Sequence, residues 1–271
     1  MTVIAQRGGR PPTRPFAASL LAAGALALQL VLVPAFAPAA FATDATPPAE
    51  LAKFCEVPDD LISDGFLKYA RSAYRTGQPL RIVVFGTSSS AGAGASTRTD
   101  AYAARLQQDL QARFTIPVEV INKSIGGQTA RQMTARLEDD VVSLSPTLVI
   151  WQTGTVDSVG NVQVEDFGRA LSQGVEILEK EGIDVIFMNM QYSRRIELLV
   201  NYGPYTEMMN AVVAQSDAVL FDRLEMMRHW ATEGRLDFDD MPRAQRASRA
   251  AKLHECIALQ LGDMIEKAVR R

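Results

Sequence analysis

Short apolar segments alternate with amphipathic helical patterns from residue 59 to the C-terminus. Strands that are apolar on both faces are typical of a parallel sheet buried between two layers of helices. We therefore predict an α/β fold, a three-layer α/β/α sandwich around a five-stranded parallel sheet. The predicted strands are 81–85, 118–121, 147–151, 184–188 and 218–221. The predicted helices are 59–75, 100–114, 129–142, 163–181, 205–215, 222–232 and 246–270.

The N-terminal segment has the three parts of a secretory signal. Arg7, Arg10 and Arg14 precede an apolar stretch from about residue 16 to 36, and Ala40-Phe41-Ala42 is a small-x-small cleavage signal. An uncleaved membrane anchor is the alternative, because the apolar stretch is long enough to span a bilayer. The prolines and small residues at its end favour cleavage.

We divide the chain accordingly into a signal peptide (1–42), a linker and N-terminal tether (43–55) and one folded domain (56–271). A cleaved signal predicts a periplasmic or secreted protein, with a possible association with the cell envelope. The net charge is −3 and the basic residues are dispersed, so no nucleic-acid partner is expected.

Cys55 and Cys256 are the two cysteines of the chain. In an exported protein such a pair predicts a disulfide, and two unrelated buried thiols are the alternative. Two cysteines and two histidines are too few for a structural zinc cluster. We expect neither a metal nor a cofactor.

The turn after the first predicted strand carries Gly86-Thr87-Ser88, followed by two more serines. Parallel sheets bind ligands at the carboxyl ends of their strands. Ser88 is therefore a candidate nucleophile. Ser89 and Ser90 are candidates for turn formation through bonds to their own backbone.

Polar loops also follow the next strands. Asn122 begins a loop in which Gly127 can offer a backbone N–H to a ligand oxygen, and Gly154 to Asp157 follow the third strand. A serine that faces glycine amides is a layout for acyl transfer, with a nucleophile and oxyanion donors.

With these blocks the chain resembles the SGNH/GDSL hydrolase family over roughly residues 80 to 270. Gly86-Thr87-Ser88 corresponds to the family's Gly-Asp-Ser, Asn122–Gly127 to its second block, and Gly154-Thr155-Val156-Asp157 to its Gly-x-Asn-Asp. The resemblance implies a flavodoxin-like α/β/α fold, Ser88 as nucleophile and Gly127 as oxyanion donor. It also implies that Asn122, Gly154 and Asp157 surround the oxyanion and substrate.

Two departures from the family bear on activity. Val156 stands where the family has an asparagine that donates to the oxyanion, and no Asp-x-x-His precedes the last helix. Asp237, Asp239 and Asp240 are present, but Met-Pro-Arg and a basic, alanine-rich run follow them. The histidine that should act as base is displaced or absent.

His254 and His229 are the histidines that could replace this base. His254, in the last predicted helix, is our candidate, and a surface or capping role in that helix is the alternative. His229 lies on the helix after the fifth strand and is a weaker candidate. For Asp157, we favour a structural role in which its carboxylate fixes backbone N–H groups of the third loop.

Three functions remain open. The first is an exported serine esterase that acts on an acyl or acetyl ester of a small molecule, glycan or lipid. The second is an O-acyltransferase, which passes the acyl group to an envelope polysaccharide or lipid. The third is a catalytically impaired domain of the same fold that binds an envelope glycan or partner. A serine without a base is poorly activated, so the histidine decides whether the domain is catalytic.

Overall fold

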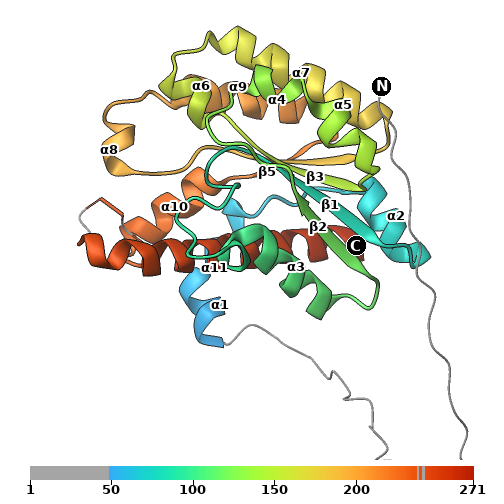
Figure 1. Cartoon of the computed structure of the whole chain (residues 1–271), viewed down its shortest axis with the longest axis horizontal. Helices are drawn as coiled ribbons and strands as arrows, with labels where there is room; N and C mark the ends of the chain where they lie inside the picture. Colours follow the sequence, from blue (N-terminus) through green and yellow to red (C-terminus); the bar gives the residue numbers. More distant parts are fainter. Residues whose placement is uncertain (1–48, 237, 240–241) are drawn as a thin grey trace, which may run out of the picture. The chain divides into compact units, whose positions relative to one another are not determined.

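The computed structural model describes residues 49–236, 238–239 and 242–271 (Figure 1). Within these ranges five strands form one parallel sheet in the order β2-β1-β3-β4-β5, which confirms the predicted fold class. The signal peptide predicted for 1–42 lies outside the described residues, as do residues 43–48 of the linker and tether. The strands are β1 (Leu80–Phe85), β2 (Val118–Asn122), β3 (Leu148–Gln152), β4 (Asp184–Met188) and β5 (Val219–Phe221).

Alternate residues of each strand face opposite helix layers. In β1, Leu80, Ile82 and Val84 belong to one apolar core, and Val83 and Phe85 belong to the other. Both faces of the sheet are covered, which is why its strands are apolar throughout (Figure 1). The first core is covered by α2 (Lys68–Thr76), α3 (Tyr102–Arg113), α10 (Arg223–Thr232) and α11 (Arg246–Arg270). The second is covered by α4 (Ala130–Thr134), α5 (Leu137–Asp140), α7 (Val164–Lys180) and α9 (Gly203–Ala214).

Helix α1 (Ala49–Cys55) packs against the long α11, and the two helices are joined by a disulfide between Cys55 and Cys256. The predicted disulfide is thus confirmed. The tether predicted for 43–55 is helical from Ala49 onward. None of the helices in the part of the chain described here is long and apolar enough to cross a membrane.

Two predicted helices are wrong in extent. The segment from Asp59 forms only a 3-10 turn, Asp59–Leu61, before α2 begins at Lys68. Gly65 lies so close to Val219 that a side chain there would collide with it, so the chain crosses the start of β5 without helical structure.

The helix predicted for 129–142 is divided into α4, α5 and a 3-10 turn, Val142–Leu144. The Thr134 hydroxyl donates to the carbonyl of Ala130 in its own helix and to that of Ala170 in α7. Such bonds bend helices, and the backbone leaves the helical region at Arg136.

Short helices not predicted from the sequence lie in two loops at the carboxyl edge of the sheet. They are α6 (Thr155–Val159) after β3 and α8 (Arg194–Glu197) after β4. The chain passes from β1 to β2 on one side and then crosses to β3 on the other. The loops after β1 and β3 therefore flank the switch point at which such sheets bind ligands.

Candidate active site

Most hydroxyl groups of the turn after β1 point inward and donate to the side-chain amide oxygen of one buried residue, Gln152. The Oε1 of Gln152, at the end of β3, accepts from the Thr87 N–H at 2.9 Å and from the Thr87 hydroxyl at 3.0 Å. It also accepts from the hydroxyls of Ser90 at 3.1 Å and Ser89 at 3.3 Å. Gly86 makes this approach possible, because a Cβ there would lie 2.5 Å from Ser90 Oγ.

Ser88 is the hydroxyl of this turn that points outward. It is exposed, and no residue in the described part of the chain accepts from or donates to its Oγ. Its Oγ lies against the second loop, where a Cβ on Gly126 would be 2.9 Å away. The N–H of Ile125 donates to the carbonyl of Gly86 at 2.9 Å and holds the two loops together.

Two backbone N–H groups are available near this hydroxyl. Among the described residues none accepts from the N–H of Ser88 or Gly127. Ser88 begins a helix-like turn, in which Ala91 N–H donates to Thr87 and Ala93 N–H to Ser88, so its own N–H has no partner within the turn. Gly127 has φ of +78°, a left-handed conformation that favours glycine. The layout suits stabilisation of an oxyanion.

Asn122 and Gly154 shape the surrounding loops. The Asn122 amide donates to the carbonyl of Ser90 at 2.7 Å, and its oxygen accepts from Ser124 N–H at 3.0 Å. Gly154 has φ of +95°, and a Cβ there would lie 2.6 Å from Met190 Sδ. The structure therefore gives both residues a role in holding the loops together.

Asp157 is fully buried at α6 and its carboxylate is occupied by backbone. Its oxygens accept from the N–H of Ala130, the first residue of α4, at 3.0 and 3.1 Å. Burial raises the pKa of this carboxyl despite its backbone bonds. The neighbouring Val156 is half-buried and offers no donor.

His254 lies beside the Ser88 turn with both ring nitrogens bonded to backbone. Its Nδ1 accepts from the Tyr102 N–H at 3.2 Å, so Nε2 carries the proton of the neutral ring and donates to the Ala93 carbonyl at 3.3 Å. Burial lowers the pKa of this histidine, which favours the neutral form. In this arrangement neither nitrogen can accept a proton from Ser88.

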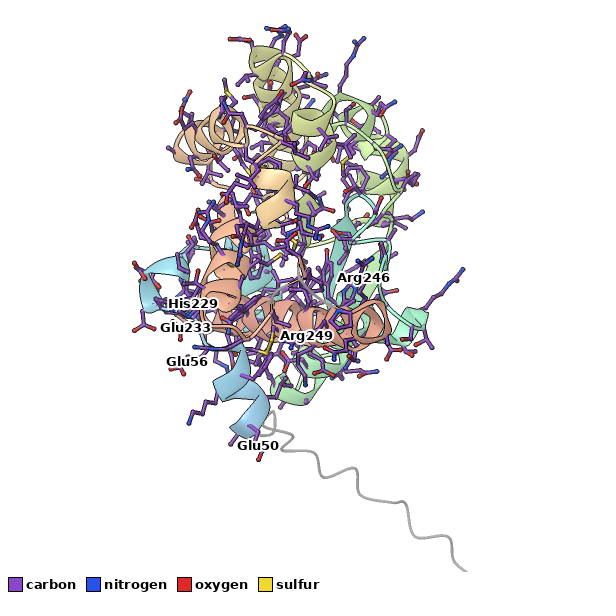
Figure 2. The ribbon with its side chains drawn as sticks, turned by 90° about the vertical axis from the view of Figure 1, so that its left-hand side faces the viewer. Glu50, Glu56, His229, Glu233, Arg246 and Arg249 are labelled. Carbon is purple, nitrogen blue, oxygen red and sulfur yellow. A yellow bond between two sulfur atoms is a disulfide. The ribbon has the colours of Figure 1, made fainter. Side chains whose placement is uncertain are left out.

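The other histidine lies on α10, and Asp239 binds the start of α8. His229 lies in the last turn of α10, next to Trp230, whose indole N–H donates to the carbonyl of Glu56 (Figure 2). Asp239 accepts from the Ser193 hydroxyl at 2.8 Å and from the Arg194 N–H at 2.6 Å, which fixes the start of α8. Asp237 and Asp240 lie outside the described residues.

Arg223 was not singled out from the sequence. Its side chain is almost completely buried, and it donates to the carbonyls of Asn189 at 2.8 Å and Met190 at 3.3 Å and to Ser89 Oγ at 2.8 Å. Burial lowers the pKa of the guanidinium to about 10. A signal was present in the sequence, because Arg223 comes two residues after the apolar run of β5.

A cavity of about 670 Å³ opens between the Ser88 turn and α11. Its walls include Ser89, Ala93, Arg223 and His254. No three His, Cys, Asp or Glu side chains in the described ranges are grouped so that they could hold a metal ion.

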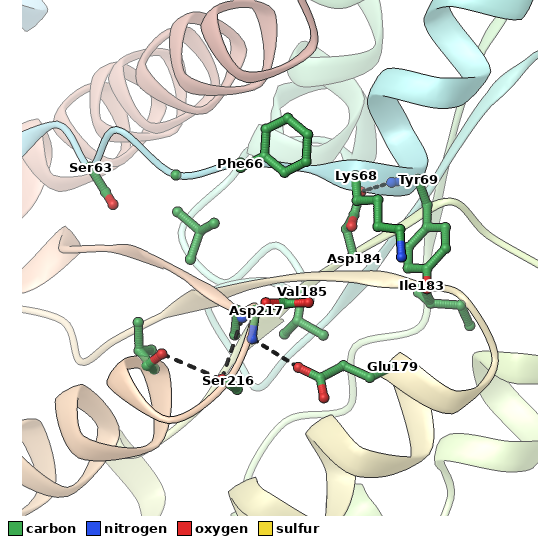
Figure 3. A pocket seen from close by; sticks show the side chains of 14 residues that line it. Ser63, Phe66, Lys68, Tyr69, Glu179, Ile183, Asp184, Val185, Ser216 and Asp217 are labelled. Atoms are coloured by element: carbon green, nitrogen blue, oxygen red, sulfur yellow. Dashed lines mark hydrogen bonds between the residues drawn. The ribbon is translucent and has the colours of Figure 1, made fainter. Parts of the chain in front are cut away.

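A second cavity, of about 620 Å³, lies where β4 and β5 begin, at the opposite edge of the sheet (Figure 3). Its buried carboxyl group is that of Asp184, which accepts from the N–H groups of Tyr69 and Ala70 at 2.8 Å and so starts α2. Burial raises the pKa of Asp184 to about 6. We assign this carboxylate a structural role and place the candidate site at the carboxyl edge.

Comparison with known proteins agrees with this fold. A model described as the non-GDSL lipase-like family matches residues 54–271. No curated protein matches the chain. Among solved structures, TesA is 22% identical with a TM-score of 0.55, over 68% of this chain and 99% of its own.

Two further solved structures show the same fold. A catalytic mutant of Axe2, an acetylxylan esterase from Geobacillus stearothermophilus, is 17% identical with a TM-score of 0.54, over 68% of this chain and 93% of its own. The psychrotrophic esterase EstA from Pseudoalteromonas sp., inhibited by monoethylphosphonate, is 19% identical with a TM-score of 0.51, over 67% and 98%.

Proposed function

The chain belongs to the non-GDSL lipase-like family, and on that premise we propose that it is an ester hydrolase with Ser88 as its nucleophile. One observation carries this proposal. Three of the four hydroxyl side chains between residues 87 and 90 are held by Gln152, and that of Ser88 lies free against Gly126. The family resemblance predicted from the sequence is confirmed, and Thr87 in place of the aspartate of Gly-Asp-Ser fits the description of the family.

The proposed chemistry follows from the two loops. Ser88 Oγ attacks the ester carbonyl carbon, the bond to the alcohol breaks, and water then releases the acyl group from Ser88. The N–H groups of Ser88 and Gly127 donate to the oxyanion that forms. Val156 supplies no third donor, and loss of one such donor typically costs about 3–4 kcal/mol in the transition state. We expect a slow esterase.

The base is the open step of this mechanism. We propose His254, which reaches the Ser88 turn through the Ala93 carbonyl. In the structure, Nδ1 accepts from the Tyr102 N–H and Nε2 donates to the Ala93 carbonyl. The ring can accept the Ser88 proton only after both of these hydrogen bonds have broken. Catalysis through His254 therefore requires the segment around Ala93 to move.

The test is hydrolysis of 4-nitrophenyl acetate together with labelling by an aryl phosphonate, located by mass spectrometry. We expect turnover and a phosphonylated Ser88, both absent in Ser88→Ala. Ser96→Ala is the matched control, because this serine is exposed on the same loop. Equal rates for Ser88→Ala and the unaltered protein would exclude Ser88 as nucleophile. His254→Gln should lower kcat more than it raises KM if the histidine is the base.

A second candidate function rests on the His254 geometry. With both ring nitrogens bonded to backbone and Val156 in the oxyanion region, the domain suits binding of an envelope glycan or partner without catalysis. This function predicts no phosphonate labelling and no turnover. If the protein is an O-acyltransferase, the phosphonate should label Ser88, and an acylated glycan should form when a glycan acceptor is supplied. The proposed substrates are acetyl or other acyl esters of a small molecule, glycan or lipid.

We also propose that the protein is exported after cleavage near residue 42. The Cys55–Cys256 disulfide supports this, because disulfides persist in oxidising compartments. The mass of the protein isolated from its native cell gives the mature N-terminus. A chain that retains residues 1–42 would contradict cleavage.

A further inference from the structure

Arg223 is a buried cation without a carboxylate partner. Its side chain is 1% exposed, and no Asp or Glu in the described part of the chain forms an ion pair with it. A guanidinium has five N–H groups, and three of these donate to Ser89, Asn189 and Met190. Burying an unpaired charge is costly. The remaining two N–H groups have no hydrogen-bond partner among the described residues, and Arg223 is one of the residues that line the cavity beside the Ser88 turn.

The cavity that Arg223 lines is cationic and partly apolar. Its described lining contains Arg223 and Arg246 and no carboxylate. The helix α11 adds an apolar wall that includes Ala247, Ala250 and Ile257. A molecule with one anionic group and a compact carbon skeleton matches these two kinds of wall.

The cavity adjoins the proposed nucleophile. Ser89, the residue after Ser88, lines it and accepts from the Arg223 guanidinium at 2.8 Å. Ala93 also lines it, and its N–H donates to the Ser88 carbonyl at 2.9 Å. Ser88 does not itself line the cavity, but it lies next to Ser89 in the chain, and consecutive Cα atoms are about 3.8 Å apart.

We propose that this cavity binds the anionic group of the substrate through Arg223, so that the preferred substrate is an ester whose alcohol or acyl part carries a carboxylate. The planar guanidinium matches a carboxylate in geometry, and Arg246 at the mouth adds positive charge. The ester part of this statement rests on the function proposed for Ser88. The anion site itself does not.

A purely structural role for Arg223 is the competing explanation. The side chain does tie the carbonyls of Asn189 and Met190 to the Ser88 turn. A structural arginine, however, should be indifferent to a carboxylate in the cavity. The two explanations differ in whether the protein distinguishes an anionic molecule from a neutral one of the same shape.

The first experiment compares 4-acetoxybenzoate with 4-acetoxybenzamide, which differ in one charge at the end remote from the ester. We expect kcat/KM to be about 10- to 100-fold higher for the carboxylate, the range of a hydrogen bond to a charged group. Arg223→Gln should bring the ratio near 1, and Arg246→Gln should reduce it in part. Arg249→Gln is the control, because Arg249 is also on α11 but does not line the cavity (Figure 2). Equal kcat/KM values for the two esters would overturn the proposal.

The second experiment measures binding of benzoate and benzamide to Ser88→Ala by calorimetry and so does not depend on turnover. We expect benzoate to bind at least about tenfold more tightly, with the difference removed by adding Arg223→Gln. If Arg223→Gln does not fold, Ala247→Phe fills the mouth of the cavity from the exposed side and should weaken benzoate binding about tenfold. Equal binding of benzoate and benzamide, or benzoate binding unchanged by these variants, would sink the anion site.

The two experiments separate the two proposals. Benzoate binding that depends on Arg223, with no hydrolysis of either ester, would leave the anion site standing and remove the esterase. Hydrolysis of both esters at equal rates, with no preference for benzoate in binding, would support the esterase and remove the anion site.

Discussion

The turn after β1 and the helix α11 lie on two sides of one cavity but differ in how their polar groups are used. In the turn, Gln152 binds three neighbouring hydroxyls and leaves that of Ser88 outward, as a nucleophile requires. On α11, the ring of His254 is bonded on both sides by backbone. The proposed nucleophile is exposed, whereas the proposed base is held by backbone on both sides.

The two regions differ in what holds their groups in place. The serine turn depends on close backbone contacts, since a side chain at Gly86 or Gly126 would meet Ser90 or Ser88. The cavity beside it is lined by a buried Arg223 and an exposed Arg246. In the proposed anion site, these arginines hold the substrate with its ester next to Ser88. This positioning operates in a chain that lacks the Asp-x-x-His block of the SGNH/GDSL family.

The largest effect should come from Ser88→Ala. Removing the nucleophile of a serine hydrolase leaves only binding and oxyanion stabilisation, so kcat/KM for 4-nitrophenyl acetate should fall at least about a thousandfold. Because Ser88 Oγ has no partner among the described residues, stability should not change. A thermal melt measured with the kinetics checks both. A fall in kcat/KM of less than about tenfold would mean that Ser88 is not the nucleophile.

The next largest effect concerns stability. Cys55→Ala with Cys256→Ala removes a disulfide between residues 201 positions apart and should lower the free energy of unfolding by about 2–5 kcal/mol. Because Cys256 lies two residues from His254, the loss should loosen the α11 side first. Hydrogen exchange should then rise in α1 and α11 before it rises in β1. A uniform rise across both regions would contradict the contrast between them.

The sequence predicted the elements that are set by local patterns. All five strands and the helix 246–270 were found, because buried strands and a long amphipathic helix have clear periodicity. The helix predicted for 59–75 failed because tertiary contact at Gly65 overrode local preference. The short α6 and α8 lie in loops whose carboxylate contacts join distant segments. Asp157 in α6 binds the N–H of Ala130, and Asp239 binds the N–H of Arg194 at the start of α8.

The candidate site was predictable where it depends on loops that follow neighbouring strands. Gly86 and Ser88 lie in the loop after β1 and Gly127 in the loop after β2, so their meeting could be expected. The occupation of His254 by Tyr102 and Ala93 joins segments more than 150 residues apart and leaves no sequence pattern. For the same reason the buried Arg223 could not be recognised as a cavity residue, although its place after β5 was visible.

A gain of function tests the oxyanion side. Val156→Asn places an amide where the SGNH/GDSL family that the sequence resembles has one, and a single donor is worth about a hundredfold or more in established sites. We expect a more modest rise in kcat, about tenfold, because the α6 backbone was not selected around this amide. Val156→Leu, whose side chain is close to asparagine in shape but has no hydrogen-bond donor, is the control. If kcat does not rise, the oxyanion does not form next to residue 156 of α6.

The smallest effect should be the pH dependence of stability carried by His254. Burial lowers the pKa of this histidine below its ordinary value of about 6.5, although the Ala93 carbonyl opposes the shift. The unfolded chain therefore binds a proton first as the pH falls below about 6.5, and the folded state loses at most about 1.4 kcal/mol per pH unit. Above that pH the histidine is neutral in both states and contributes no such loss.

His254→Gln should abolish this loss, so the difference in unfolding free energy between the variant and the unaltered protein should change between pH 6.5 and 5 and be constant above pH 7. Two carboxyls have pKa values raised to about 6, that of the partly buried Asp109 on α3 and that of the buried Asp184. They destabilise the fold as the pH rises rather than as it falls, and their contribution cancels in the difference between the two proteins. A difference that stays constant down to pH 5 would mean that the ring accepts a proton in the folded state. The imidazole would then be free to serve Ser88 as a base, and the contrast between the two sides of the cavity would disappear.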